Sequence, residues 1–163
     1  MTDKTAATFL RPDRTALLVV DLQEKLLPAI ATTQYQRGLG PTVLEVTQAA
    51  GGTVPLDKVT FGCFGSPEFL ARLAALGGRD QLLVAGIESH ICVAQTVVGA
   101  LEKGYTVHVA SDAVGSRSEE NRAIGLGRME KAGALVSSTE MAIYELLGRS
   151  DAAAFKKMLP LLK

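Results

Sequence analysis

The sequence predicts an α/β fold, a doubly wound and mainly parallel sheet with helices on both faces. Four short apolar runs, at residues 16–20, 81–86, 106–111 and 134–138, are continuous rather than alternating, which is typical of parallel strands covered on both faces. Helical patterns separate the later runs, and this alternation favours right-handed crossovers. The 163 residues suffice for one core, so we expect a single domain over residues 1–163.

The N-terminal half contains two predicted strands, each of which leads to a charged residue. The run at residues 16–20 stops at Asp21, and the weaker strand TVPL, at residues 53–56, precedes Lys58. A structural interpretation of Asp21 is that it caps a helix in EKLLPAI. A structural interpretation of Lys58 is that it is a solvated surface lysine.

Helix signals are clearest in SPEFLARLAALGG. Ser66 is the expected N-cap, Pro67 takes the first helical position, and Gly77 or Gly78 ends the helix. Further helices are predicted over residues 92–103, 118–132 and 139–148, with a frayed one in AAAFKKMLPLLK.

Composition excludes several classes of protein. The 17 Lys and Arg residues balance the 17 Asp and Glu residues, whereas a nucleic-acid partner favours a basic surface. No apolar run approaches the ~20 residues of a membrane helix, and MTDKTAATFLRPDR has no secretory pattern. Cys63 and Cys92 are too few for a disulfide framework, so we expect reduced thiols, a cytoplasmic location and a small-molecule substrate.

Three residues with side chains capable of chemistry follow predicted strand ends. Asp21, Cys92 and Asp112 can line one crevice, because ligands of such sheets bind beyond the carboxyl ends of the strands. A thiol at a helix N-terminus feels the positive end of the helix dipole, which favours the nucleophilic thiolate. The turn ESHIC also supplies backbone N–H groups that suit an oxyanion. From spacing alone, however, a buried structural role is favoured for Cys92, and more strongly for Cys63.

Metal and nucleotide sites are not expected. His90 and His108 are far apart and have no ligand cluster, so neither a metal nor an organic cofactor is implied. The stretch GLGRMEKAG resembles a glycine-rich nucleotide loop only loosely, and it lies inside a predicted helix rather than after a strand.

Four stretches together resemble the isochorismatase-like hydrolase family, close to its small single-domain members. They are ALLVVDLQEKLLPAI, LDKVTFGCFGSPEF, LLVAGIESHICVAQTVVGALEKGYTVHVASDAVGSRS and ALVSSTEMAIYELL, in the family's order. The resemblance implies a Rossmann-like fold and a catalytic triad of Asp21, Lys58 and Cys92. It also implies a non-proline cis peptide bond before Glu88, and an oxyanion hole formed by the backbone N–H groups of Glu88 and Cys92.

The reaction implied by the resemblance is hydrolysis of a C–N bond in a small amide or related acyl compound, through a thioester to Cys92. Asp21 would be the general acid/base, and Lys58 would tune Asp21 and Cys92. Tyr35 and Phe61 are expected to shape the pocket, and a homo-oligomer is expected because relatives commonly form one.

Two other functions stay open from the sequence. One is a catalytically silent family member that acts as a protein-interaction scaffold. The other is a thiol redox protein in which Cys63 would serve as the resolving cysteine of Cys92.

Two features depart from the family pattern. The segment TTQYQRGLGPT contains no histidine where nicotinamidase-type members carry metal ligands, which argues against a metal and against nicotinamide. The same segment follows Asp21 by only about ten residues, and a parallel crossover needs a dozen or more. We therefore expect a helix and a strand of the family to be missing between about residues 28 and 33.

Overall fold

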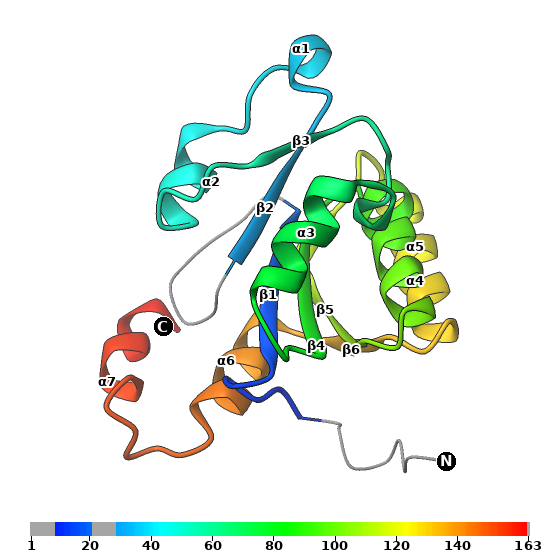
Figure 1. Ribbon diagram of the computed structural model, residues 1–163. Coiled ribbons are helices and arrows are strands. Elements are labelled where there is room, and N and C mark those ends of the chain that lie inside the picture. The colour runs from blue at the N-terminus through cyan, green and yellow to red at the C-terminus, as the bar shows by residue number, and fades with distance from the viewer. Residues whose placement is uncertain (1–8, 21–28, 163) are drawn as a thin grey trace.

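The computed structural model describes residues 9–20 and 29–162. Its centre is one six-stranded sheet in the order β3-β2-β1-β4-β5-β6, and every neighbouring pair is parallel (Figure 1). The strands are β1 (Thr15–Val20), β2 (Ala29–Gln34), β3 (Leu56–Lys58), β4 (Gln81–Ile87), β5 (Thr106–Gly115) and β6 (Leu135–Ser137). The prediction of a doubly wound parallel sheet is confirmed.

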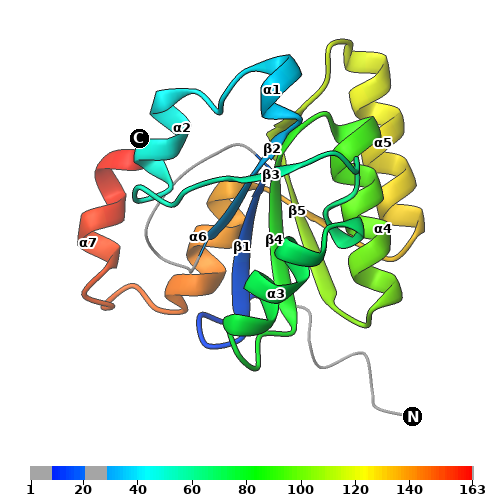
Figure 2. The same cartoon turned by 45° about the horizontal axis from the view of Figure 1, so that its top comes forward.

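Helices cover the two faces of the sheet unequally. One face packs against α3 (Pro67–Ala75), α4 (Ala94–Glu102) and α5 (Glu119–Lys131), and the other packs against α6 (Thr139–Leu147). Figure 2 shows α3 and α6 on opposite sides of the strands. Leu17 and Leu18 illustrate the division, because successive strand residues point to opposite faces and these two belong to different core clusters.

Shorter helical segments lie between the main elements and near the C-terminus. They are α1 (Gln36–Leu39) and α2 (Leu44–Ala49) between β2 and β3, α7 (Phe155–Met158) near the C-terminus, and 3₁₀ turns at Cys63–Gly65 and Leu159–Leu161. Within the described ranges, no helix is long and apolar enough to cross a membrane.

Serine N-caps begin the longer helices where the sequence predicts them. The Ser66 hydroxyl accepts the Phe69 N–H at 3.3 Å at the start of α3, and Pro67 takes the first position. Ser118 caps α5 in the same way, accepting the Asn121 N–H at 3.2 Å. The helix predictions over these segments are confirmed.

The prediction of a missing second strand is wrong. β2 occupies residues 29–34 between β1 and β3, with Leu18 opposite Ile30 and Thr33 opposite Asp57. Its sequence AIATTQ lacks a continuous apolar run, yet its four central residues are buried. The eight residues that join β1 to β2, including most of the predicted helix in EKLLPAI and the place of a crossover helix, lie outside the described residues.

The placement of Asp112 in the crevice is also wrong. β5 continues past Asp112 to Gly115, because a register shift against β4 lengthens the strand. The Asp112 carboxylate accepts the Thr139 N–H at 2.7 Å and the Thr139 hydroxyl at 2.9 Å. Asp112 therefore fixes the start of α6 rather than a ligand.

Candidate active site

A cavity of about 240 Å³ lies at the carboxyl ends of β2 and β3. Its polar lining includes Gln34, Lys58 and Cys92, which come from β2, β3 and the turn after β4. The remaining wall is built mainly from threonine hydroxyls and aliphatic side chains, namely Thr32, Thr33, Leu39, Gly40, Pro41, Thr42, Val43 and Ile87. The crevice therefore lies where the parallel sheet predicts a ligand site.

Lys58 is held inside the protein at the end of β3. Its side chain is 4% exposed, and its ammonium donates to the side-chain oxygen of Gln34 at 2.6 Å. The same ammonium also donates to two backbone carbonyls, those of Thr60 at 2.9 Å and Phe61 at 2.8 Å. The surface interpretation of Lys58 is wrong, and the short turn after β3 supplies acceptors that satisfy a buried cation.

Cys92 lies in a π-helical turn, Ser89–Val93, between β4 and α4. The peptide bond between Ile87 and Glu88 is cis, as the family resemblance implied. The Cys92 sulfur lies 4.0 Å from the side-chain oxygen of Gln34, which is the oxygen that accepts from Lys58. Gln34 therefore links the lysine to the thiol.

The thiol of Cys92 is less acidic than its place before a helix suggests. Its side chain is 8% exposed, and burial raises the pKa of Cys92, while the charge of Lys58 acts in the opposite direction. The expected preference for the thiolate is thus reversed in direction by desolvation.

Contacts on both sides hold the turn that carries Cys92. The Glu88 carbonyl accepts the N–H groups of Ile91 (3.0 Å) and Val93 (3.2 Å). The Glu88 carboxylate pairs with Arg117 at 2.9 Å, and this hydrogen bonding lowers the pKa of Glu88. At Gly125 of α5, an added Cβ atom would lie 2.8 Å from the backbone nitrogen of His90. Only glycine therefore permits this close approach of α5 to the turn.

Three further candidates have different outcomes. Asp21 lies outside the described residues. In the sequence it directly follows Val20, and Val20 pairs with Gly86, which precedes the cis peptide bond between Ile87 and Glu88. Tyr35 and Phe61 are half-exposed, and neither is among the residues that line the cavity. Phe61 contributes instead through its backbone carbonyl, which accepts from Lys58.

Gln34 is a site residue that the sequence prediction missed. A polar residue at the carboxyl end of a strand is the signal that singled out Asp21, but the strand before Gln34 was not predicted. Both cysteines are free thiols, and the Cys63 sulfur lies 3.8 Å from the Thr32 hydroxyl. In the described part of the chain, no group of three His, Cys, Asp or Glu side chains is placed to hold a metal.

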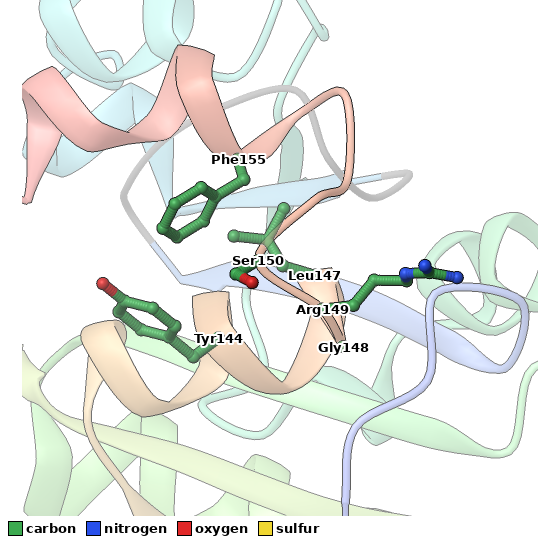
Figure 3. Close-up of a pocket in the computed structure, with 6 residues that line it drawn as sticks. All are labelled: Tyr144, Leu147, Gly148, Arg149, Ser150 and Phe155. Carbon is green, nitrogen blue, oxygen red and sulfur yellow. The ribbon is translucent and has the colours of Figure 1, made fainter.

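A second cavity lies between α6 and α7, away from these polar groups. It also measures about 240 Å³ and is lined by Tyr144, Leu147, Gly148, Arg149, Ser150 and Phe155 (Figure 3). Tyr144 and Phe155 meet edge to face, with ring centroids 6.1 Å apart. Its lining supplies no nucleophile comparable to a thiol.

Comparison with known proteins identifies relatives of the whole arrangement. The family model described as Isochorismatase domain matches residues 30–141. The secreted isochorismatase effector Isc1 of Phytophthora sojae is 38% identical over 84% of this chain and 67% of its own length. Isochorismatase domain-containing protein 2 of Danio rerio is 35% identical over 83% of this chain and 68% of its own. The chain thus spans about two thirds of these relatives.

Solved structures agree on the fold. A structure of MAR1 ribonuclease from Caenorhabditis elegans has a TM-score of 0.84 and 34% identity, and the match covers 94% of this chain and 92% of that one. The YcaC gene product of Escherichia coli, described as an octameric hydrolase of unknown specificity, has a TM-score of 0.80. At 23% identity over 90% of this chain and 85% of that one, YcaC supports the fold alone.

Proposed function

The chain belongs to the isochorismatase family of hydrolases, and on that premise we propose that it hydrolyses a small amide or related acyl compound with Cys92 as the nucleophile. The observation that carries the proposal is the shared oxygen of Gln34, 2.6 Å from the Lys58 ammonium and 4.0 Å from the Cys92 sulfur. A buried cation beside a buried thiol at a cavity wall is an arrangement that favours nucleophilic chemistry over packing.

In the proposed reaction, the Cys92 sulfur attacks the carbonyl carbon of the substrate. Asp21 takes the thiol proton, and the backbone N–H groups of Glu88 and Cys92 stabilise the oxyanion. The C–N bond then breaks, and the amine leaves with the proton from Asp21. Water deprotonated by Asp21 attacks the thioester, which releases the acid and restores the thiol.

The role of Lys58 in this scheme is electrostatic. Its positive charge opposes the effect of burial on Cys92 and favours the thiolate that forms during attack. Because three acceptors hold the ammonium, we expect it to act from a fixed position rather than to transfer a proton itself.

The proposal is tested by a panel of small aliphatic and aromatic amides, with release of ammonia or amine as the readout. Wild type should turn over at least one of them, and Cys92→Ala should reduce the rate by a factor of at least about 1,000. Equal turnover in both proteins would contradict the proposal. A trapped acyl-thioester on Cys92, seen by mass spectrometry, would support the covalent step directly.

The rival function is a catalytically silent scaffold. A scaffold needs neither a buried lysine nor a thiol beside it, and this argument favours the enzyme. Absence of turnover across the amide panel, with partner binding unchanged by Cys92→Ala, would favour the scaffold.

We also propose a homo-oligomer in the cytoplasm. Exposed apolar side chains next to the segments that line the cavity support an interface between copies, among them Leu44 and Val59. The two free cysteines fit a reducing compartment. Light scattering should give a mass above the 17.2 kDa of one chain, and Leu44→Lys with Val59→Lys should lower it.

A further inference from the structure

We propose that the cavity beside Cys92 accepts a small acyl group without net charge and discriminates against one that carries a carboxylate. This inference rests on the proposed function, because it takes the cavity at Cys92 as the place where the acyl group binds.

Among the described residues that line the cavity, the side chains around Cys92 are uncharged apart from Lys58. Thr33 and Thr42 share a hydrogen bond between their hydroxyls, which fastens the segment after α1 to β2. Leu39, Val43 and Ile87 present aliphatic surface to the same space. Among the described residues that line the cavity, Lys58 is the one charged side chain.

Lys58 has no N–H group left for a substrate. An ammonium has three N–H donors. In Lys58 these are matched by three acceptors, the Gln34 side chain and the carbonyls of Thr60 and Phe61, at distances of 2.6 to 2.9 Å. A substrate carboxylate would have to displace one of them, or else lose its water without gaining a charged hydrogen-bond donor among the described lining residues, which is unfavourable. A neutral acyl group meets no such barrier.

A matched pair of alkylating reagents tests this without any substrate. Iodoacetamide and iodoacetate react with a thiolate in the same way: a sulfur–carbon bond forms and iodide leaves. They differ only in carrying an amide or a carboxylate. Rates at Cys92 are measured by peptide mass spectrometry, and the ratio of the two rates is divided by the ratio for glutathione at the same pH.

We expect the normalised ratio to favour the neutral reagent by a factor of about 10 or more, because the carboxylate loses solvent without compensation. The fraction of thiolate cancels in the ratio, so the raised pKa of Cys92 does not affect it. A normalised ratio of about 1 or less would mean that Lys58 or another cation receives the carboxylate. That result would overturn the inference.

A charge placed on the cavity wall should change the preference. Leu39 lines the cavity and is 74% exposed, so Leu39→Arg should fold and should reduce the neutral preference by a factor of about 5. Ile124 on α5 is 59% exposed and is not among the lining residues, so Ile124→Arg is the matched control and should leave the ratio unchanged. Equal ratios in both variants would overturn the inference.

Turnover separates this inference from the proposed function. Butyramide and succinamate differ by a methyl group and a carboxylate at the same end of the chain. Cys92-dependent hydrolysis of succinamate at least as fast as butyramide would overturn the neutral preference while the hydrolase function stands. Selective alkylation without turnover of any amide would remove the hydrolase function while the selectivity of the cavity stands.

Discussion

At the level of single residues, the site combines a buried thiol with a buried cation. Burial has a larger effect on the pKa of the thiol than the charge of the cation has. Burial raises the pKa of Cys92, so in the proposed reaction a base has to remove the thiol proton for attack on a carbonyl. Asp21 is the proposed base, and it directly follows the last residue of β1 in the sequence. The proposed chemistry therefore depends on a carboxylate rather than on a permanently ionised cysteine.

The pH dependence of alkylation tests this balance of charge and burial. Cys92 should react with a midpoint above the ~8.5 of a free thiol, because burial disfavours the thiolate. Lys58→Met should raise the midpoint further, because it removes the charge that favours the thiolate. Peptide mapping separates Cys92 from Cys63. A midpoint below that of glutathione, or one unaffected by Lys58→Met, would contradict the assignment.

The hydrogen bond between Gln34 and Lys58 should contribute to the stability of the protein. Gln34→Leu leaves the Lys58 ammonium without its side-chain acceptor, so the free energy of unfolding should fall by about 1–3 kcal/mol. Gln48→Leu on α2 is an exposed control with the same change in chemistry, and should alter stability by less than about 0.5 kcal/mol. Urea unfolding measures both variants, and equal losses would show that the bond to Lys58 contributes little.

At the scale of elements, the turn that carries Cys92 depends on the helix behind it. α5 approaches the turn at Gly125, where an added Cβ would meet the backbone of Ser89 and His90 at 2.8 to 3.0 Å. At Gly127, two residues further along α5, an added Cβ would meet nothing within 4 Å. The two glycines therefore separate helix propensity from contact with the site.

Alanine at these two positions should act in opposite directions. Gly125→Ala should lower the free energy of unfolding by about 1–3 kcal/mol and reduce amide turnover, because α5 must move away from the Cys92 turn. Gly127→Ala should raise stability by up to about 1 kcal/mol, because alanine is the better helix former. Thermal unfolding and turnover are measured together. Normal turnover in Gly125→Ala would mean that the turn does not need this contact.

The elements that the sequence predicted are those with local signals. Ser66 with Pro67, and Ser118 with the acidic first turn after it, begin helices through contacts within three residues of the cap. β2 was missed because AIATTQ becomes a strand only through its neighbours: Ile30, Thr32 and Thr33 are buried by β1, β3 and the helices, not by their own pattern.

The same distinction explains the candidate site. Lys58 and Cys92, which both line the cavity, lie in or beside a strand or turn that the sequence indicates, although β3 covers Leu56–Lys58 rather than the predicted residues 53–56. Gln34 was missed with its strand, and Asp112 was misplaced because the register shift between β4 and β5 is a property of the pair, not of either sequence. Tyr35 and Phe61 fit a pocket wall by side-chain type alone, and side-chain type does not specify the direction in which a residue outside the strands points.

At the scale of the whole molecule, the two sides of the sheet have different cores. The side facing α3, α4 and α5 holds the larger cluster, whereas the smaller cluster of described residues on the side facing α6 consists only of buried leucines and alanines, among them Leu17 and Ala110. His108 is buried in β5 next to Ala110, and its Nε2 atom has no hydrogen-bond partner among the described residues. Global stability should therefore be sensitive to the protonation of this histidine.

Burial lowers the pKa of His108, and the charge of Glu145 on α6 partly opposes this shift. The unfolded chain, with a histidine pKa near ~6.5, then binds a proton that the native state does not. The contribution of neutral His108 to the free energy of unfolding should be fully present above about pH 6.5. The free energy of unfolding should fall as the pH drops below that value, by at most about 1.4 kcal/mol per pH unit. His108→Gln should flatten this slope whatever its effect on stability at pH 8. Urea unfolding between pH 5 and 8 measures the slope, and an equal slope in the variant would assign the acid sensitivity to other groups.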